Sequence, residues 1–264
     1  MSIEEMLDTD LQRMAPARVF DNFYMLGMKT VTAWALVTAE GIILFDAMLH
    51  HNVEETVIES LKRLDLDPAS IKYVIVSHAH NDHFGGAQYL QEKYGARIVM
   101  SIDDWEHMKS WPQLGSPAPL PQEDIAVRDG DSITVGDTTV DFVVTPGHTP
   151  GTLSSVFPVR DGESVHYIGY WGGAAVSFLP PEKITEYMAS AERFARSGDR
   201  IDVPLSNHPY IDGSLQKLAR LKDRGVNDPH PFVEGNSDFV EWMATIHGCA
   251  GEVLAQKLKD SEAD

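Results

Sequence analysis

Three histidines and one aspartate stand within six consecutive positions, His78–His83, which read His-Ala-His-Asn-Asp-His. Imidazole and carboxylate are ligands that zinc accepts readily, and a catalytic zinc site keeps one position open for water. A lone histidine is more often an ordinary core or surface residue. Four such side chains this close together instead predict a metal site.

The residues before this segment suggest how its side chains point. Tyr73–Ser77 is an apolar, β-branched run that predicts a buried strand leading into it. If the strand stays extended for a few more residues, His78 and His80 project to the same side, because side chains alternate along a strand. Asp82 and His83 then lie in the turn that follows and face a second metal position nearby.

Two further ligands are expected in loops that follow strand-like runs. His148 lies in the loop Pro146–Gly151, after the apolar run Val140–Val144, and glycines on both sides of it permit a tight turn. The last ligand must come from the remaining histidines, which are His50, His51, His107, His166, His208, His230 and His247. We favour His208, because it repeats this setting after the run Ile201–Leu205.

The composition limits the other possibilities. Hydrophobic residues make up 43% of the 264, enough for one substantial core, and the single cysteine, Cys249, excludes an intramolecular disulfide and a thiolate zinc site. The net charge of −19 disfavours nucleic-acid binding. No apolar stretch approaches the ~18 residues of a membrane span. We expect a small-molecule substrate and neither a nucleic-acid nor a membrane partner, and we leave the oligomeric state open.

The N-terminus has no basic start followed by an apolar run, so it does not read as a secretory signal. We therefore expect a cytoplasmic protein. A signal peptide removed before the first residue would make it periplasmic instead.

Hydrophobic periodicity and turn residues divide the chain into strands and helices. Strands are expected at Phe23–Leu26, Thr30–Thr38, Gly41–Asp46, Tyr73–Ser77, Arg97–Ser101, Ile125–Arg128, Ser132–Val135, Thr138–Thr145, Leu153–Pro158, Ser164–Gly169 and Ile201–Leu205. Helices are expected at 2–14, Asn52–Leu64, Gly85–Tyr94, Asp103–Lys109, Pro181–Arg196, Leu215–Arg224 and Asp238–Leu258. Pro112–Pro121 holds four prolines and is expected to be an irregular loop near the site.

This order of elements predicts an α/β fold. Two sheets packed face to face, with helices on their outer faces, would bury every apolar face. We expect a four-layer αββα sandwich that forms a single domain over residues 1–264.

The His-x-His-x-Asp-His segment, the spacing of His148 and the Asn-His-Pro at 207–209 together resemble the metallo-β-lactamase superfamily, over about residues 20 to 258. The context of the last histidine and the stretch Pro231–Gly235 are most similar to the third subclass of metallo-β-lactamases and their relatives. The resemblance implies a supporting, non-ligating role for Asp46. It also implies two zinc ions, the first held by His78, His80 and His148 and the second by Asp82, His83 and His208.

The chain departs from the family pattern after the strand Ser164–Gly169. Many members that are not lactamases, such as glyoxalase II-like thioesterases and many lactonases, carry a metal-bridging aspartate there. Here Tyr170 and Trp171 follow, and no carboxylate is present. Lactamases also lack that aspartate, so the departure favours lactam chemistry, although their usual serine or cysteine is absent too. Tyr170 and Trp171 are expected to bind substrate, with core packing of Trp171 as the alternative.

The expected reaction follows from the metal. Zinc lowers the pKa of bound water towards ~7, so a metal-bound hydroxide can attack a carbonyl at neutral pH. Asp82 is the expected catalytic residue, which orients the hydroxide and then moves its proton. The leading hypothesis is the opening of a cyclic amide, a β-lactamase-type activity. The alternative is a lactonase or esterase acting on a cytoplasmic metabolite, which the missing signal peptide favours.

Three other classes of protein fit the sequence less well. Its acidity and the lack of an inserted basic arm disfavour an RNA-processing nuclease. Iron redox enzymes on this fold need an acidic ligand where Tyr170 and Trp171 stand, or a glutamate within the segment His78–His83, and neither is present. The complete ligand set disfavours a pure binding module.

Overall fold

Two β-sheets form the centre of the molecule. The computed structural model describes residues 2–110, 117–225 and 228–263. The first sheet has seven strands in spatial order along the chain: β1 (Ala17–Phe20), β2 (Phe23–Gly27), β3 (Thr32–Thr38), β4 (Gly41–Phe45), β5 (Ile71–Ile75), β6 (Arg97–Ser101) and β7 (Ile125–Val127). Its strands pair antiparallel from β1 to β4 and parallel from β4 to β7.

The second sheet has five strands in the order β12-β11-β10-β9-β8. They are β8 (Ser132–Val135), β9 (Thr138–Val144), β10 (Leu153–Asp161), β11 (Ser164–Trp171) and β12 (Val203–Ser206). All neighbours pair antiparallel except β11 and β12, which are parallel. A parallel pair needs a long crossover, and α6 (Pro181–Phe194) provides it here.

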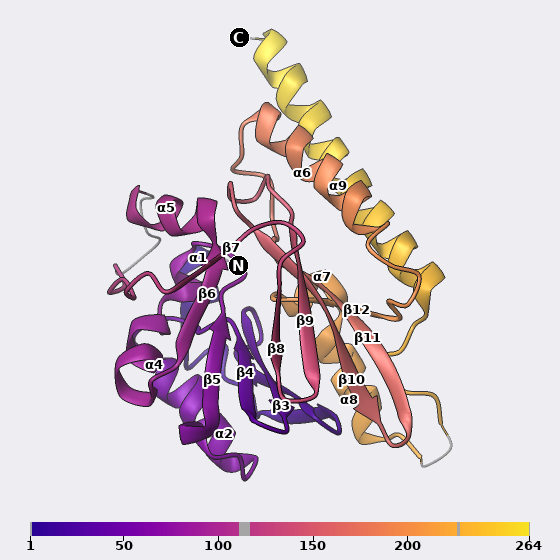
Figure 1. The fold of residues 1–264 in the computed structure, drawn as a ribbon. Coiled ribbons are helices and arrows are strands. Elements are labelled where there is room, and N and C mark those ends of the chain that lie inside the picture. The colour runs from indigo at the N-terminus through magenta and orange to yellow at the C-terminus, as the bar shows by residue number, and fades with distance from the viewer. Residues whose placement is uncertain (1, 111–116, 226–227, 264) are drawn as a thin grey trace.

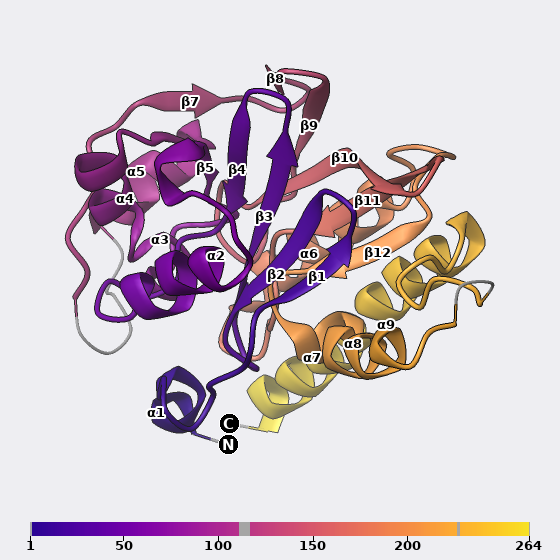
Figure 2. The same ribbon diagram turned by 90° about the horizontal axis from the view of Figure 1, so that it is seen from below.

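Helices cover the outer face of each sheet (Figures 1 and 2). The first sheet carries α2 (Glu59–Arg63), α4 (Ala87–Tyr94) and α5 (Ile102–Ser110), and the second carries α6 and α9 (Asn236–Ala263). Stacked aromatic rings fill the space between the sheets, with Phe23 against Trp34 and Phe45 against Phe157. Two further apolar clusters join each sheet to its helices. The expected four-layer αββα sandwich is confirmed.

The shorter elements connect these layers. They are α1 (Ile3–Leu7), a π-helical turn (Glu54–Ile58) that runs into α2, a 3-10 turn (Pro68–Ser70), α3 (Asn81–Phe84), α7 (Pro209–Asp212) and α8 (Ser214–Lys222). None of the helices in the described ranges has the length and apolarity needed to span a membrane.

Some expected boundaries were wrong. The helix expected over 2–14 ends at Leu7, because the Asp8 side chain accepts a hydrogen bond from the Leu11 N–H and turns the chain. The strand β1 was not expected, and its pairing with β2 rather than its own pattern defines it. Of the expected loop Pro112–Pro121, residues 112–116 lie outside the described residues, and 117–121 have no regular structure.

Candidate metal centre

Loops after the ends of β5, β9 and β12 carry the candidate ligands to one place. The strand β5 ends at Ile75, so the expected continuation of the strand through His80 is wrong. His78 and His80 lie in the loop before α3, and the Ser77 carbonyl fixes this loop by accepting a 2.7 Å hydrogen bond from the Leu153 N–H at the start of β10. The two sheets are thus joined directly beside the ligands.

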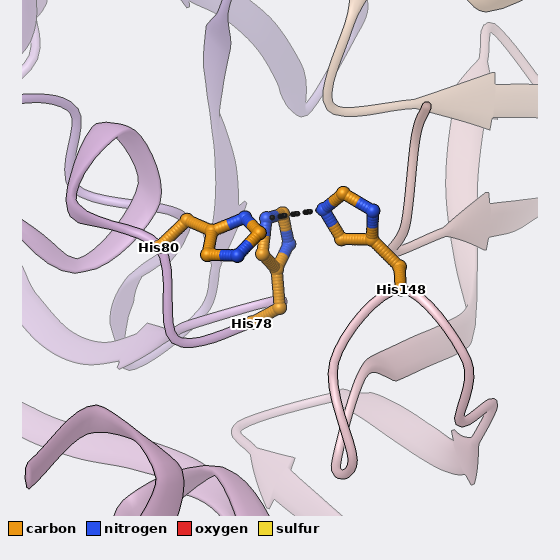
Figure 3. A group of neighbouring side chains, drawn as sticks. All are labelled: His78, His80 and His148. Atoms are coloured by element: carbon orange, nitrogen blue, oxygen red, sulfur yellow. Dashed lines mark hydrogen bonds between the residues drawn. The ribbon is translucent and has the colours of Figure 1, made fainter. Parts of the chain in front are cut away.

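The candidate ligands form two groups, in each of which the ligand atoms lie within 4.8 Å of one another. We call His78, His80 and His148 the three-histidine group, and Asp82, His83 and His208 the mixed group. All six side chains are buried. Figure 3 shows how the rings of the three-histidine group converge from two facing loops.

The three-histidine group presents bare nitrogens. The Nδ1 atoms of His78 and His148 lie 2.8 and 2.9 Å from the carbonyl oxygens of Gly172 and Ala175. A carbonyl only accepts, so each Nδ1 carries the proton. Burial keeps the pKa of both rings well below the ordinary value, and burial lowers the pKa of His80 to about 4. These rings are therefore neutral at pH 7.

It follows that the Nε2 atoms of His78 and His148 carry lone pairs and no proton. They face each other at 3.1 Å, with no hydrogen to share between them. Ligands of a tetrahedral zinc at 2.0–2.1 Å lie about 3.3 Å apart, close to this spacing. The pair is arranged as ligands of a cation.

The mixed group carries charge. His83 donates from Nδ1 to Asp46 Oδ2 at 2.8 Å, and its Nε2 lies 3.3 Å from Asp82 Oδ2 and 3.2 Å from His208 Nε2. Burial alone would lower the pKa of His83, but Asp82 and Asp46 outweigh it and raise that pKa above the ordinary value. Burial lowers the pKa of His208 to about 4, and its Nδ1 donates to the Thr30 carbonyl at 2.7 Å.

Asp46 supports the site without joining either group. Its carboxylate accepts from His83 and from both the N–H and the hydroxyl of Ser77, at 2.7 and 2.9 Å. Its backbone is left-handed, with φ 63°, a conformation that costs free energy for most residues but that aspartate tolerates. Asn207 extends the network by donating to the Ser77 hydroxyl and to the Gly172 carbonyl, both at 2.9 Å. One hydrogen-bond network therefore underlies both groups.

The residues present fit metal ions. Asp82 Oδ1 is buried and has no hydrogen-bond partner among the described residues. A buried carboxylate oxygen without a donor is costly unless a cation neutralises it. Three imidazoles in one group, and two imidazoles with a carboxylate in the other, are donor sets of the kind that catalytic zinc sites use.

The model of the metallo-beta-lactamase superfamily matches residues 26–161, which is more than half of the chain and includes His78, His80, Asp82, His83 and His148. The chain belongs to the metallo-beta-lactamase superfamily. Its described residues hold a candidate two-metal site of the kind expected in this superfamily.

Solved structures of the same superfamily match almost the whole chain. A subclass B3 metallo-beta-lactamase of Bradyrhizobium japonicum is 25% identical, with a TM-score of 0.80 over 96% of both chains. A motif mutant of a metallo-beta-lactamase from Cronobacter sakazakii is 26% identical, with a TM-score of 0.77 over 96% of this chain and 100% of that one.

The curated relatives that match the sequence are named hydroxyacylglutathione hydrolases, not lactamases. A hydroxyacylglutathione hydrolase of Acidiphilium cryptum is 30% identical over 148 residues, which is 49% of this chain and 56% of the relative. One of Rhodopseudomonas palustris is 33% identical over 94 residues, or 36% of this chain and 32% of the relative. The chain thus spans about half the length, or less, of these relatives.

Within this metallo-beta-lactamase fold, Tyr170 and Trp171 do not lie where they were expected. The strand β11 continues to Trp171, two residues beyond its expected end at Gly169, so successive side chains point to opposite faces of the sheet. Tyr170 enters the core between the sheets and its hydroxyl lies 3.3 Å from Asp46 Oδ2. Trp171 packs under α6, where its indole N–H donates to the Tyr187 hydroxyl at 3.0 Å.

Both side chains are buried, at 1% and 0% exposure. Neither Tyr170 nor Trp171 is therefore exposed to a substrate in this structure, and Trp171 packs in the core, as its alternative interpretation expected.

Two aromatic residues that the sequence did not single out flank the ligands instead. Phe178, in the loop after β11, has its ring 5.6 Å from that of His148 and 6.2 Å from that of His80. Tyr210, in α7, has its ring 5.2 Å from that of His208. They are 52% and 55% exposed, so both rings are accessible to a molecule bound beside the candidate ligands. Tyr210 is two residues from His208 in the sequence, but Phe178 is 30 residues from the nearest candidate ligand, so the sequence alone does not mark them as a pair.

Proposed function

We propose that this chain is a zinc-dependent hydrolase that holds one ion in the three-histidine group and a second in the mixed group. The observation that carries the proposal is the pair of unprotonated Nε2 atoms of His78 and His148, 3.1 Å apart in a buried site. The unpartnered Asp82 oxygen supports the second position. Bound zinc would supply a Lewis acid and lower the pKa of a water molecule towards ~7.

Asp82 is the proposed catalytic residue. Burial alone would raise the pKa of its carboxyl, but His83 outweighs that effect and holds the pKa below the ordinary value, so Asp82 is ionised at neutral pH. Its Oδ2 lies beside His83, while Oδ1 is left without a donor. With one of these oxygens on the second ion, the other would be available to orient the attacking water and to accept its proton, which then passes to the leaving group.

The proposed substrate is a cyclic amide, opened by β-lactamase-type hydrolysis. The stretch Tyr170–Ala175 reads Tyr-Trp-Gly-Gly-Ala-Ala and offers no carboxylate that could bridge two metals. Subclass B3 lactamases are among the similar structures. Phe178 and Tyr210 take the substrate-binding role, because their exposed rings offer apolar contact on either side of the ligands.

The similarity to hydroxyacylglutathione hydrolases favours one alternative, which is hydrolysis of an ester, lactone or thioester of a metabolite. The same metal centre serves either reaction, since both begin with water attacking a carbonyl carbon. Only the leaving atom differs, nitrogen in one case and oxygen or sulfur in the other.

The test is a substrate panel on zinc-loaded protein, containing nitrocefin, a penem, several lactones and a hydroxyacylglutathione thioester. Turnover of the lactams, lost on chelation and in His148→Ala, is the expected result. His247→Ala is the matched control, because it removes a histidine of α9 that contacts Glu192 away from the ligands. Turnover confined to esters or thioesters would replace the lactam proposal, and no turnover of any carbonyl substrate by zinc-loaded protein would overturn it.

A further inference from the structure

Asp104 is a buried carboxylate of α5 that belongs to neither ligand group, yet it binds both loops of the three-histidine group. Its Oδ2 accepts hydrogen bonds from the Ala79 N–H at 2.9 Å and from the Thr149 hydroxyl at 2.7 Å. Its Oδ1 accepts from the Gly151 N–H at 2.7 Å. Ala79 stands between His78 and His80, and Thr149 follows His148 directly. A single carboxylate therefore spans the gap across which the ligands face each other.

The start of α5 is packed tightly against the His148 loop. The Ser101 hydroxyl donates to the Gly151 carbonyl at 2.6 Å and accepts from the Asp104 N–H at 3.2 Å. A Cβ atom on Gly151 would lie 2.1 Å from Ser101 Oγ and 2.6 Å from the Asp104 nitrogen, so only glycine permits this approach. The loop is held at one distance from α5, and through Asp104 at one distance from the His78 loop.

We propose that Asp104 is a positioning residue that fixes His148 relative to His78 and His80, and thereby sets the metal affinity of the three-histidine group. The two main ring supports of this group are main-chain carbonyls on the β11 side, and they do not connect its two loops. Asp104 makes that connection. The inference rests on the proposed metal binding, and it concerns the affinity of one group rather than the reaction.

The experiment measures zinc affinity at the three-histidine group alone, in a His208→Ala background that disables the mixed group. Asp104→Asn keeps the shape of the side chain but turns an amide N–H towards a backbone N–H that needs an acceptor. Loss of an outer partner of a metal ligand costs about 10- to 100-fold in metal affinity. We expect Asp104→Asn to weaken zinc binding by that factor, measured by competition with a chromophoric chelator.

Asp212→Asn is the matched control. Asp212 is also buried and also accepts backbone hydrogen bonds, from Ser206 at 2.7 Å and Ser214 at 2.8 Å, but it touches neither loop of the three-histidine group. Its substitution should change the affinity less than threefold. The visible absorption spectrum of Co²⁺ bound to the group should shift in Asp104→Asn and stay unchanged in Asp212→Asn, which a general loss of stability would not produce.

Substitutions at Thr149 give a second test, in which a smaller loss of zinc affinity is expected. Thr149→Val removes only the hydroxyl and should weaken zinc binding several-fold. Thr149→Ser keeps the hydroxyl and should bind zinc as tightly as the His208→Ala parent. Unchanged affinity in folded Asp104→Asn overturns the inference, and if that variant does not fold, unchanged affinity in Thr149→Val does so. A His208→Ala parent that binds no zinc would instead overturn the proposed function itself.

Discussion

The two ligand groups are neighbours, but they differ in the charge that their histidine rings carry. In the three-histidine group, His78 and His148 donate to main-chain carbonyls and their rings are neutral. In the mixed group, His83 lies between the carboxylates of Asp46 and Asp82 and carries a proton when no metal is bound. The first group therefore offers lone pairs at once, whereas the second must give up a proton for a metal ion.

The two groups also differ in whether a mutation can change the hydrogen-bond partners of their rings. The carbonyls of Gly172 and Ala175 belong to the backbone and stay in place when side chains change. His83 depends instead on the side chain of Asp46, which a single substitution alters. A substitution should accordingly reach the three-histidine group through its loops, as at Asp104, whereas in the mixed group it can act directly on a ring, as at Asp46.

Removing one ligand from each group tests whether the two act as separate metal sites. We expect His148→Ala and His208→Ala each to retain one zinc per chain. Loss of a residue that hydrogen-bonds to a metal ligand lowers activity ~10- to 100-fold. Each of these two variants should lose more activity than that, because it lacks a residue that binds the metal directly. Metal analysis after dialysis, together with initial rates, measures both effects. A variant that kept two zinc ions and full turnover would remove its histidine from the assigned group.

Asp46→Asn should distinguish the groups by their supports. The substitution turns an amide N–H towards the ring N–H of His83 or towards Ser77, so the mixed group should bind zinc about 10- to 100-fold more weakly. The three-histidine group should change far less. Stepwise zinc titration of the full chain resolves the two affinities.

Asp202→Asn is the control for that comparison. Asp202 pairs with His166 at 2.6 Å and also accepts the Tyr167 N–H, so it reproduces a His–Asp pair away from the ligands. Its substitution should leave both zinc affinities unchanged. Equal weakening of both groups in Asp46→Asn would mean that the network under them acts as one support.

The six candidate ligands could be selected from the sequence because they lie in short local motifs. Four of the six candidates stand within the segment His78–His83. The Pro-Gly-His and Asn-His-Pro loops each follow an apolar strand, and this place in the sequence was enough to select His148 and His208. The αββα layers were predictable for a similar reason, since strand and helix periods alternate in a recognisable order. The postulated extension of the strand through His80 was nevertheless wrong, although the ligands it was meant to align do come together.

What the sequence could not supply depends on contacts between distant residues. Tyr170 and Trp171 are buried because β11 runs two residues further than expected, and its pairing with β12 decides that. Asp104 is 25 residues from Ala79 and 45 from Thr149, so no local pattern links them. Phe178 and Tyr210 stand out only once their exposure beside the ligands is known.

The charge difference between the groups predicts different responses to pH. The pKa of His83 is raised, so below that value a proton competes with zinc for the mixed group, and affinity should rise about tenfold per pH unit from 6.5 to 8. In the three-histidine group the pKa values are lowered, to about 4 for His80, so its affinity should stay nearly flat over this range. Chelator competition in the His148→Ala and His208→Ala backgrounds measures each slope. Equal slopes would contradict the contrast.

The smallest expected effects are on substrate binding. They show which part of the substrate lies beside each ligand group. Phe178 lies beside the three-histidine group and Tyr210 beside the mixed group, and both rings are about half exposed. A substrate that covers about 40 Å² of either ring gains roughly 1 kcal/mol, or about fivefold in KM. Phe178→Ala and Tyr210→Ala should each raise KM by that factor with little change in kcat, while Tyr210→Phe should not.

Substrates that differ in the group on one side of the scissile bond should respond to only one of the two variants, Phe178→Ala or Tyr210→Ala, because each ring is expected to contact a different half of the substrate. A response of every substrate to both variants would show that the rings form one shared surface and do not divide the substrate between the groups.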